Sequence, residues 1–216
     1  MNYKAVIFDL DGTLFDTIDD IADAMNDALS RLGFPPHGVE KYKYFVGDGV
    51  EDLASRSLPA HKRDEHMIKT AVTMMREAYG KCWANKTKVY EGVTELLDEL
   101  IRRGIIIAVL TNKPDDFAKM MVSELLPQYH FSVVRGSVPN VHRKPHPSGA
   151  LEITKILGLS PEECMFLGDT DVDMITAVSA GMYPVGALWG FRKAEELLES
   201  GAKILVSSPL DLLQLL

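Results

Sequence analysis

Cysteine is scarce in this sequence, and its scarcity argues against a disulfide framework. Only Cys82 and Cys164 occur among the 216 residues, and no C-x-x-C spacing is present. Two thiols so far apart in the chain are typical of reduced core or surface residues. We therefore expect no disulfide, and we assign no chemistry to either cysteine.

Long apolar runs are missing as well. No stretch approaches the roughly 20 apolar residues that span a bilayer. The first residues, Met-Asn-Tyr-Lys, lead directly into a strand-like run and leave no room for a signal sequence. The sequence also contains no repeats and no low-complexity tract. From these absences we expect a cytoplasmic protein with no membrane segment.

Basic residues are outnumbered by acidic ones. The chain has 23 lysines and arginines against 31 aspartates and glutamates, which gives a formal net charge of -8. Because phosphate backbones attract clustered positive charge, this surplus of acids argues against nucleic acid as a partner. An anionic small substrate would need a local positive centre, which a metal ion and one well-placed lysine can supply.

The order of apolar patterns predicts an α/β protein with an insertion. Residues 18–86 show helical spacing without a convincing strand, whereas strands and helices alternate from residue 90 onward. Such alternation predicts a doubly wound, mostly parallel sheet. Because the first strand must share that sheet, we expect a core of residues 1–16 and 87–216 and an inserted α-helical cap of residues 17–86. Strands are expected at residues 5–8, 105–110, 131–134, 165–167, 183–188 and 204–206, and a last helix after Ser208-Pro209.

The rest of the chain is organised around the run Ala5–Phe8. It has the length and apolar content of a buried parallel strand, and carboxylates follow at Asp9 and Asp11, where the run ends. Because side chains alternate along a strand, a spacing of two can put both acids on one side. Such a pair suits Mg²⁺, which prefers oxygen ligands. The alternative is a solvated strand end followed by a turn at Gly12.

Polar groups follow three later strands, and in a parallel sheet they would gather at the same edge as the first pair. Thr111 and Asn112 offer a hydroxyl and an amide to phosphate oxygens, although such residues also begin helices. Lys144 lies in a proline-rich segment that limits its movement, although a surface lysine fits there too. Asp169 and Asp173 are suitable Mg²⁺ ligands.

Two other metal sites are rejected at this stage. His142 and His146 have the spacing of a helical zinc pair, but Pro145 and Pro147 argue against a helix there, and we expect both histidines to be structural or peripheral. The acids from Asp169 onward begin like a calcium loop. That interpretation fails because the sixth position is Met174 instead of glycine and the twelfth is alanine instead of glutamate.

Together these residues resemble the four motifs of the haloacid dehalogenase superfamily, in order and across nearly the whole chain. The stretch from Asp9 to Leu14, Asp-Leu-Asp-Gly-Thr-Leu, resembles the first motif of its phosphatase branch. The resemblance implies a Rossmann-type core that requires Mg²⁺. It also implies individual roles: Asp9 as nucleophile, Asp11 as general acid and base with its backbone carbonyl at the metal, Thr111 and the Asn112 backbone as phosphate ligands, Lys144 as the neutralising cation, Asp169 as a metal ligand, and Asp173 as a further acid beside the metal and the lysine.

A closer resemblance is to the phosphoglycolate phosphatase-like group, which has a helical cap inserted after the first motif. The segments 111–114, 144–147 and 168–170, together with Trp189-Gly190-Phe191, are similar to that group. The loop Tyr44–Gly49 resembles its substrate-facing loop, so Gly47 is a candidate substrate contact, although an ordinary turn between helices would look the same.

The resemblance implies hydrolysis of a small phosphorylated metabolite, such as phosphoglycolate, through an aspartyl-phosphate on Asp9, by a monomer or a homodimer. Several other functions use the same residues. An inorganic pyrophosphatase, a sugar or nucleotide phosphatase and a phosphosugar mutase are the alternatives within enzymes. A non-catalytic phosphate-binding module is the alternative outside them, since a fold alone does not fix a function.

Overall fold

The chain forms two compact units. The computed structural model describes residues 3–216, and their contacts separate one unit of Met1–Phe15 and Val89–Leu216 from another of Asp16–Lys88. The chain passes between the units at β2 (Phe15–Asp16) and β3 (Lys88–Val89), and these two strands pair with each other. The first unit is therefore built from two segments of the chain, and the second is one continuous segment.

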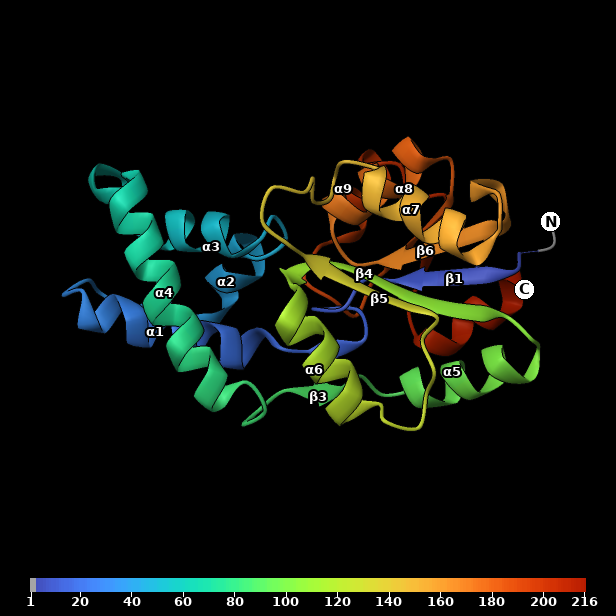
Figure 1. Ribbon diagram of the computed structural model, residues 1–216, viewed down its shortest axis with the longest axis horizontal. Helices are drawn as coiled ribbons and strands as arrows, with labels where there is room; N and C mark the ends of the chain where they lie inside the picture. The colour runs from blue at the N-terminus through green and yellow to red at the C-terminus, as the bar shows by residue number, and fades with distance from the viewer. Residues whose placement is uncertain (1–2) are drawn as a thin grey trace. The chain divides into compact units, whose positions relative to one another are not determined.

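The first unit is a six-stranded parallel sheet with helices on both faces, which confirms the predicted doubly wound fold. The strand order is β5-β4-β1-β6-β7-β8. In Figure 1, α7 and α8 cover one face of this sheet, and α5 and α6 cover the other. The strands are β1 (Ala5–Phe8), β4 (Ile106–Pro114), β5 (Val133–Ser137), β6 (Cys164–Gly168), β7 (Tyr183–Ala187) and β8 (Ile204–Val206), and the helices named are α5 (Val93–Arg102), α6 (Asp115–Leu125), α7 (Ser148–Leu157) and α8 (Asp171–Ala180).

Strand β1 lies at the centre of the sheet because every residue in it is apolar. All four of its side chains are fully buried, as expected for a strand covered by helices on both faces. It pairs with β4 on one side and with β6 on the other. The direction in which strands are added reverses at this point, and ligands of open α/β sheets bind beside such a reversal, at the carboxyl ends of the strands.

Several elements differ from the sequence prediction. Strand β4 does not end at residue 110 but continues to Pro114, which pairs with Ser137 after an irregularity in register. Strand β5 begins at Val133 instead of residue 131. Helix α9 (Ala194–Glu199) was not predicted, because it is short and buries only Leu197. The last helix, Pro209–Leu215, is a 3₁₀ helix.

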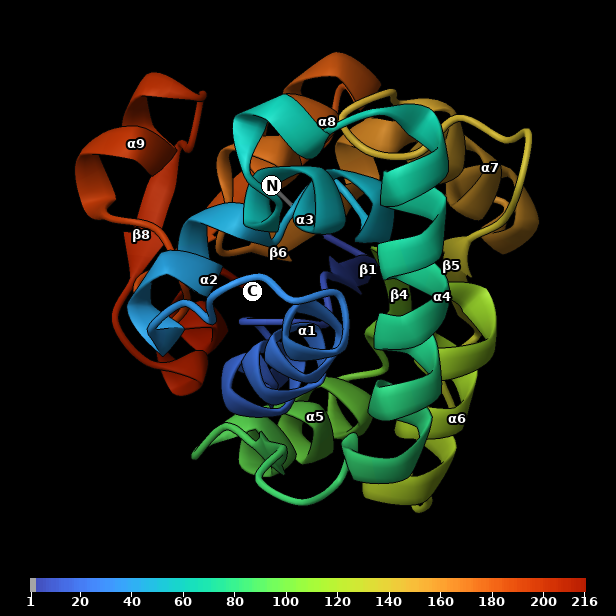
Figure 2. The same cartoon turned by 90° about the vertical axis from the view of Figure 1, so that its left-hand side faces the viewer.

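The second unit consists of helices α1 (Ile18–Arg31), α2 (Val39–Phe45), α3 (Val50–Ser57) and α4 (Glu65–Cys82). Helices α1 and α4 lie side by side, as Figures 1 and 2 both show. Asp20 on α1 is fully buried. Its carboxylate accepts hydrogen bonds from the backbone of Lys86 and Thr87 at 2.8 to 3.1 Å, which fixes the segment that leaves α4.

The structure bears on the cysteines and on the long apolar runs, both of which are scarce in the sequence. Cys82 and Cys164 are both unpaired thiols, as expected. Across residues 3–216, no helix combines the length and the apolar character that a membrane crossing requires.

Candidate functional site

The carboxyl ends of three parallel strands, together with the loop before α7, bring polar side chains into contact. Asp9 follows the last residue of β1, and its backbone amide donates to Leu167 O on β6 at 2.9 Å. Asp169 follows the end of β6, and Lys144 lies in the loop before α7. Since the strands are parallel, the chain necessarily collects these groups at one edge of the sheet.

Lys144 lies at the centre of this cluster. Its Nζ donates to Asp9 Oδ1 at 2.6 Å and to Asp173 Oδ1 at 2.5 Å. All three side chains are buried. Ion pairs that are removed from water are strong only when their geometry is well satisfied, so one ammonium group here fixes the positions of two carboxylates.

The loop that carries Lys144 is held by the side chain of Asn112. The Asn112 Nδ2 donates to Lys144 O at 2.9 Å, and the Lys144 backbone amide donates to Asn112 Oδ1 at 2.9 Å. This pair of bonds joins β4 to the loop and fixes the backbone position from which the Lys144 side chain extends. The side-chain amide of Asn112 is therefore engaged with the protein.

Asp169 is positioned by donors on both of its oxygens. Thr13 Oγ1 donates to Oδ1 at 2.8 Å, and the Phe191 backbone amide donates to Oδ2 at 2.8 Å. Two glycines make room for this carboxylate. A Cβ at Gly12, where φ is +90°, would lie 2.3 Å from Asp169 Oδ2, and a Cβ at Gly190 would lie 2.2 Å from the Asp169 Cβ.

Asp173 contributes one oxygen to the cluster and uses the other to begin a helix. Its Oδ2 accepts from the Thr170 amide at 3.0 Å and from Thr170 Oγ1 at 2.7 Å. This is the capping box of α8, which satisfies backbone donors that the first helical turn leaves unpaired. Because the cap fixes χ1 of Asp173, the remaining oxygen points reliably at Lys144.

The cluster carries more negative than positive charge. Ligand atoms of Asp9, Asp169 and Asp173 lie within 4.8 Å of one another. Burial first, and then the charge of Asp173, raise the pKa of Asp9 to about 7 against the opposing effect of Lys144. Burial first, and then the charges of Asp173 and Asp9, raise the pKa of Asp169 well above its usual range.

Lys144 responds in the opposite way. Burial would lower its pKa, but the carboxylates of Asp173 and Asp9 outweigh burial and raise it. Even a permanently charged Lys144 leaves the three acids with excess negative charge. Three buried carboxylates close together are the oxygen-rich, anionic donor set that suits a divalent cation such as Mg²⁺, so these residues fit the predicted metal.

Asp11 lies beside this cluster and has a partner that the sequence analysis missed. Lys113 Nζ donates to Asp11 Oδ1 at 2.9 Å and to Oδ2 at 3.2 Å, and both side chains are buried. The side chain of Asp11 does not belong to the group formed by Asp9, Asp169 and Asp173. Lys113 has no local pattern that marks it, and the only hint was its place one residue after Thr111 and Asn112, at the same edge of the sheet.

The remaining candidates divide between the two units. Thr111 is buried on β4, and its Oγ1 accepts from the Lys113 backbone amide at 3.2 Å. Gly47 belongs to the other unit, where it connects α2 to α3 with a φ of +129°. The rings of His142 and His146 stack with their centroids 4.3 Å apart.

The family model of haloacid dehalogenase-like hydrolases matches residues 6–187. The chain belongs to this family. The matched range contains all of the acids and lysines described above and the whole helical unit.

Relatives and solved structures within the family are similar to nearly the whole of this chain. Phosphoglycolate phosphatase 1 of Pseudomonas aeruginosa is 32% identical over 97% of this chain and 78% of its own. The phosphoglycolate phosphatase of Chromobacterium violaceum is 32% identical over 99% and 96%. A crystal structure described as a predicted phosphoglycolate phosphatase of Haemophilus somnus has a TM-score of 0.91 at 29% identity, and the similarity covers 100% of this chain and 98% of that one.

Proposed function

We propose that this protein is a magnesium-dependent phosphatase that hydrolyses a small phosphate monoester through an aspartyl-phosphate intermediate. The observation that carries the proposal is the buried carboxylate of Asp9 at the end of the central strand, held by Lys144 at 2.6 Å within a cluster of three acids. A second acid, Asp11, lies two residues further on and is held by its own lysine.

In the first step, a carboxylate oxygen of Asp9 attacks phosphorus in line with the ester oxygen. The new O–P bond forms as the bond from phosphorus to the leaving oxygen breaks, and protonated Asp11 gives its proton to that alkoxide. In the second step Asp11 takes a proton from water, the water oxygen attacks phosphorus, and the bond to Asp9 breaks. Asp9 returns as a carboxylate, Asp11 is protonated again, and inorganic phosphate leaves.

Asp9 and Asp169 would hold Mg²⁺ through their side chains and Asp11 through its backbone carbonyl, with Asp173 as a further acid beside it. When bound, the ion supplies positive charge that lets a phosphate dianion approach a carboxylate. Thr13 and the Phe191 amide keep Asp169 oriented for this task through the bonds of 2.8 Å to its two oxygens, as partners behind metal ligands generally do.

The positive side of the phosphate site comes from Lys144, with Thr111 and the Asn112 backbone as neutral ligands. A positioned ammonium stabilises the charge that spreads over the phosphoryl oxygens in the transition state. The two hydrogen bonds between the Asn112 side chain and the Lys144 backbone support this role, because they fix the loop before any substrate arrives.

The helical unit is proposed as the cap that selects the substrate, with Gly47 in its substrate-facing loop. Phosphoglycolate is the first substrate to test, because both bacterial relatives named above are phosphoglycolate phosphatases. A sugar or nucleotide phosphatase, an inorganic pyrophosphatase or a phosphosugar mutase would use the same acids. A cytoplasmic location and a monomeric or homodimeric state stay predictions.

The deciding experiment measures phosphate release from an aryl phosphate with and without Mg²⁺, beside the Asp9→Asn variant. Release that requires Mg²⁺ and is absent from the variant supports the proposal. Substantial phosphate release by the variant would refute the assignment of Asp9 as the nucleophile. A second panel then compares phosphoglycolate, pyrophosphate, sugar phosphates and nucleotides, in which a mutase is recognised by product formation with little net phosphate.

A further inference from the structure

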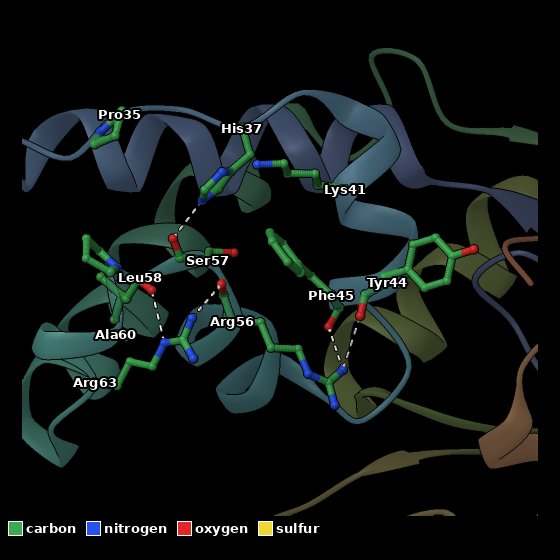
Figure 3. A pocket seen from close by; sticks show the side chains of 11 residues that line it. Pro35, His37, Lys41, Tyr44, Phe45, Arg56, Ser57, Leu58, Ala60 and Arg63 are labelled. Carbon is green, nitrogen blue, oxygen red and sulfur yellow. Dashed lines mark hydrogen bonds between the residues drawn. The ribbon is translucent and has the colours of Figure 1, made fainter.

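The helical unit contains a pocket that the proposed chemistry does not use. It lies between the segment that precedes α2, helix α2 itself, and the chain from the end of α3 to residue 63, and its volume is about 560 Å³. Cavities that hold small molecules are typically about 300–1,000 Å³. Figure 3 shows the side chains that line it, all of which belong to this one unit.

Positive charge gathers in this pocket although the whole chain carries a net charge of -8. Lys41, Arg56 and Arg63 line it, and no acidic residue does. Arg56 forms an ion pair with Asp48 next to the pocket. Within residues 3–216, neither Lys41 nor Arg63 lies in an ion pair, which leaves two positive charges without a carboxylate partner.

Both guanidinium groups donate to backbone carbonyls, and that of Arg56 also pairs with Asp48. Arg56 Nη1 donates to Phe45 O at 3.2 Å, and Arg63 Nε donates to Leu58 O at 3.0 Å. These bonds appear as dashed lines in Figure 3. Backbone carbonyls orient a guanidinium without cancelling its charge, so Arg63 keeps its positive charge, whereas the charge of Arg56 is paired with Asp48. Each arginine has five N–H donors, so donors remain for an anion. Groups fixed in advance lose less entropy when a ligand binds.

The other walls are apolar or aromatic. The Phe45 ring contacts His37 edge-on, with centroids 5.4 Å apart, and His37 Nε2 donates to Ser57 O at 2.8 Å. Leu58 is buried in the pocket wall. The pocket thus combines a rigid apolar surface with uncompensated cations.

We propose that this pocket is a binding site for a small organic anion, a carboxylate or a phosphate carried on an apolar group. The cations at Lys41 and Arg63 recognise the charged end, and the surface around Phe45 and Leu58 covers the apolar end. The site is made entirely within Asp16–Lys88, so the proposal does not depend on the catalytic role of Asp9.

The test is calorimetric titration of the full-length protein with benzoate and with phenylphosphonate, which is not hydrolysed. Benzyl alcohol, which lacks the charge, and inorganic phosphate, which lacks the ring, are the ligand controls. Arg63→Gln removes one pocket cation, and Lys62→Gln removes the neighbouring charge, which does not line the pocket. Ala60→Phe fills the pocket from an exposed position, and Arg63→Lys keeps the charge.

We expect Arg63→Gln to weaken binding of the aromatic anions about 10-fold, the effect of one charge-assisted hydrogen bond. Lys62→Gln should stay close to wild type, Arg63→Lys should recover most of the affinity, and Ala60→Phe should abolish binding. Preference for benzoate or for phenylphosphonate identifies the anion. Equal losses in the two glutamine variants, unchanged binding in Ala60→Phe, no binding to wild type, or binding lost in Asp9→Asn alone would each overturn the proposal.

Discussion

The two charged sites of this chain are opposites in sign and in construction. In the sheet unit, Asp9, Asp169 and Asp173 are buried, Lys144 pairs with Asp9 and Asp173, and Asp169 is held by the Phe191 amide. In the helical unit, Lys41 and Arg63 lie at the surface and form no ion pair with any described residue of the range 3–216. Burial turns excess charge into a strong demand for a counter-ion, whereas exposure weakens that demand through water and salt.

The largest effect is expected from a substitution of Asp9 in the sheet site. Asp9→Asn removes the attacking oxygen, so we expect phosphate release to fall by roughly 10⁴-fold or more, as for the loss of other catalytic nucleophiles. Asparagine keeps the shape and removes a negative charge from a crowded site, so the melting temperature without Mg²⁺ should stay equal or rise. Circular dichroism and thermal melting check the fold, and a melting temperature well below wild type would contradict this account of the electrostatics.

Removing the cation should damage both activity and stability. Lys144→Met leaves Asp9 and Asp173 buried without their shared partner, and breaking such a pair typically costs about 3–5 kcal/mol of unfolding free energy. We expect activity to fall by about 10³-fold. Denaturant unfolding measures the stability loss. Lys203→Met, at an exposed position, is the matched control, and a loss of equal size there would show that the ion pairs contribute nothing.

The Lys113–Asp11 pair offers a smaller and more specific effect. Lys113→Met removes the group that holds both Asp11 oxygens, so the acid loses its fixed position and kcat should fall by about 10- to 100-fold. KM should change little, since binding of the phosphate is assigned to other residues. Lys113→Arg should restore part of kcat. A rise in KM with unchanged kcat would mean that Lys113 binds substrate instead of positioning Asp11.

The smallest expected effect is a shift in melting temperature that depends on pH. The pKa of Asp9 is about 7 in the folded protein against an ordinary 3.8. The folded state therefore keeps a proton that the unfolded state loses between those values, and without metal its stability falls as pH rises from about 4 to 7.

Mg²⁺ should reverse this loss. At 100 times its dissociation constant, a ligand adds about 2.7 kcal/mol, or roughly 5–10 °C for a chain of this size. Differential scanning fluorimetry should show a larger Mg²⁺ shift at pH 8 than at pH 5. Ca²⁺ and Na⁺ at matched ionic strength are the controls, and a shift that does not depend on pH would contradict the proposed role of Asp9.

Much of the fold follows from local patterns in the sequence. The run Ala5–Phe8 is apolar throughout, and it became the central strand for that reason. Strand β4 shows the limit of such patterns. Its last residues, Thr111 to Pro114, are polar or lack an amide hydrogen, and they extend the strand because β5 is present as a pairing partner. Pairing between distant segments is not visible in a local pattern.

The candidate site shows the same limit. Because parallel strands end at one edge of the sheet, the sequence alone predicted Asp9, Lys144 and Asp169 as site residues. The bond between Lys113 and Asp11 joins residues 102 positions apart, and the bond between Thr13 and Asp169 joins residues 156 apart. Which lysine meets which acid depends on loop geometry and rotamers, and those are set by packing.

The paired strands β2 and β3 also bear on how this chain can be changed. They hold Asp16 and Lys88, the two ends of the helical unit, in adjacent strands, and adjacent strands lie about 4.8 Å apart. A two-residue hairpin turn such as Asn-Gly spans that distance. The helical unit can therefore be exchanged as a cassette: a shortened chain with a turn in its place would keep the sheet's connectivity, and a foreign helical insert would need only two neighbouring ends.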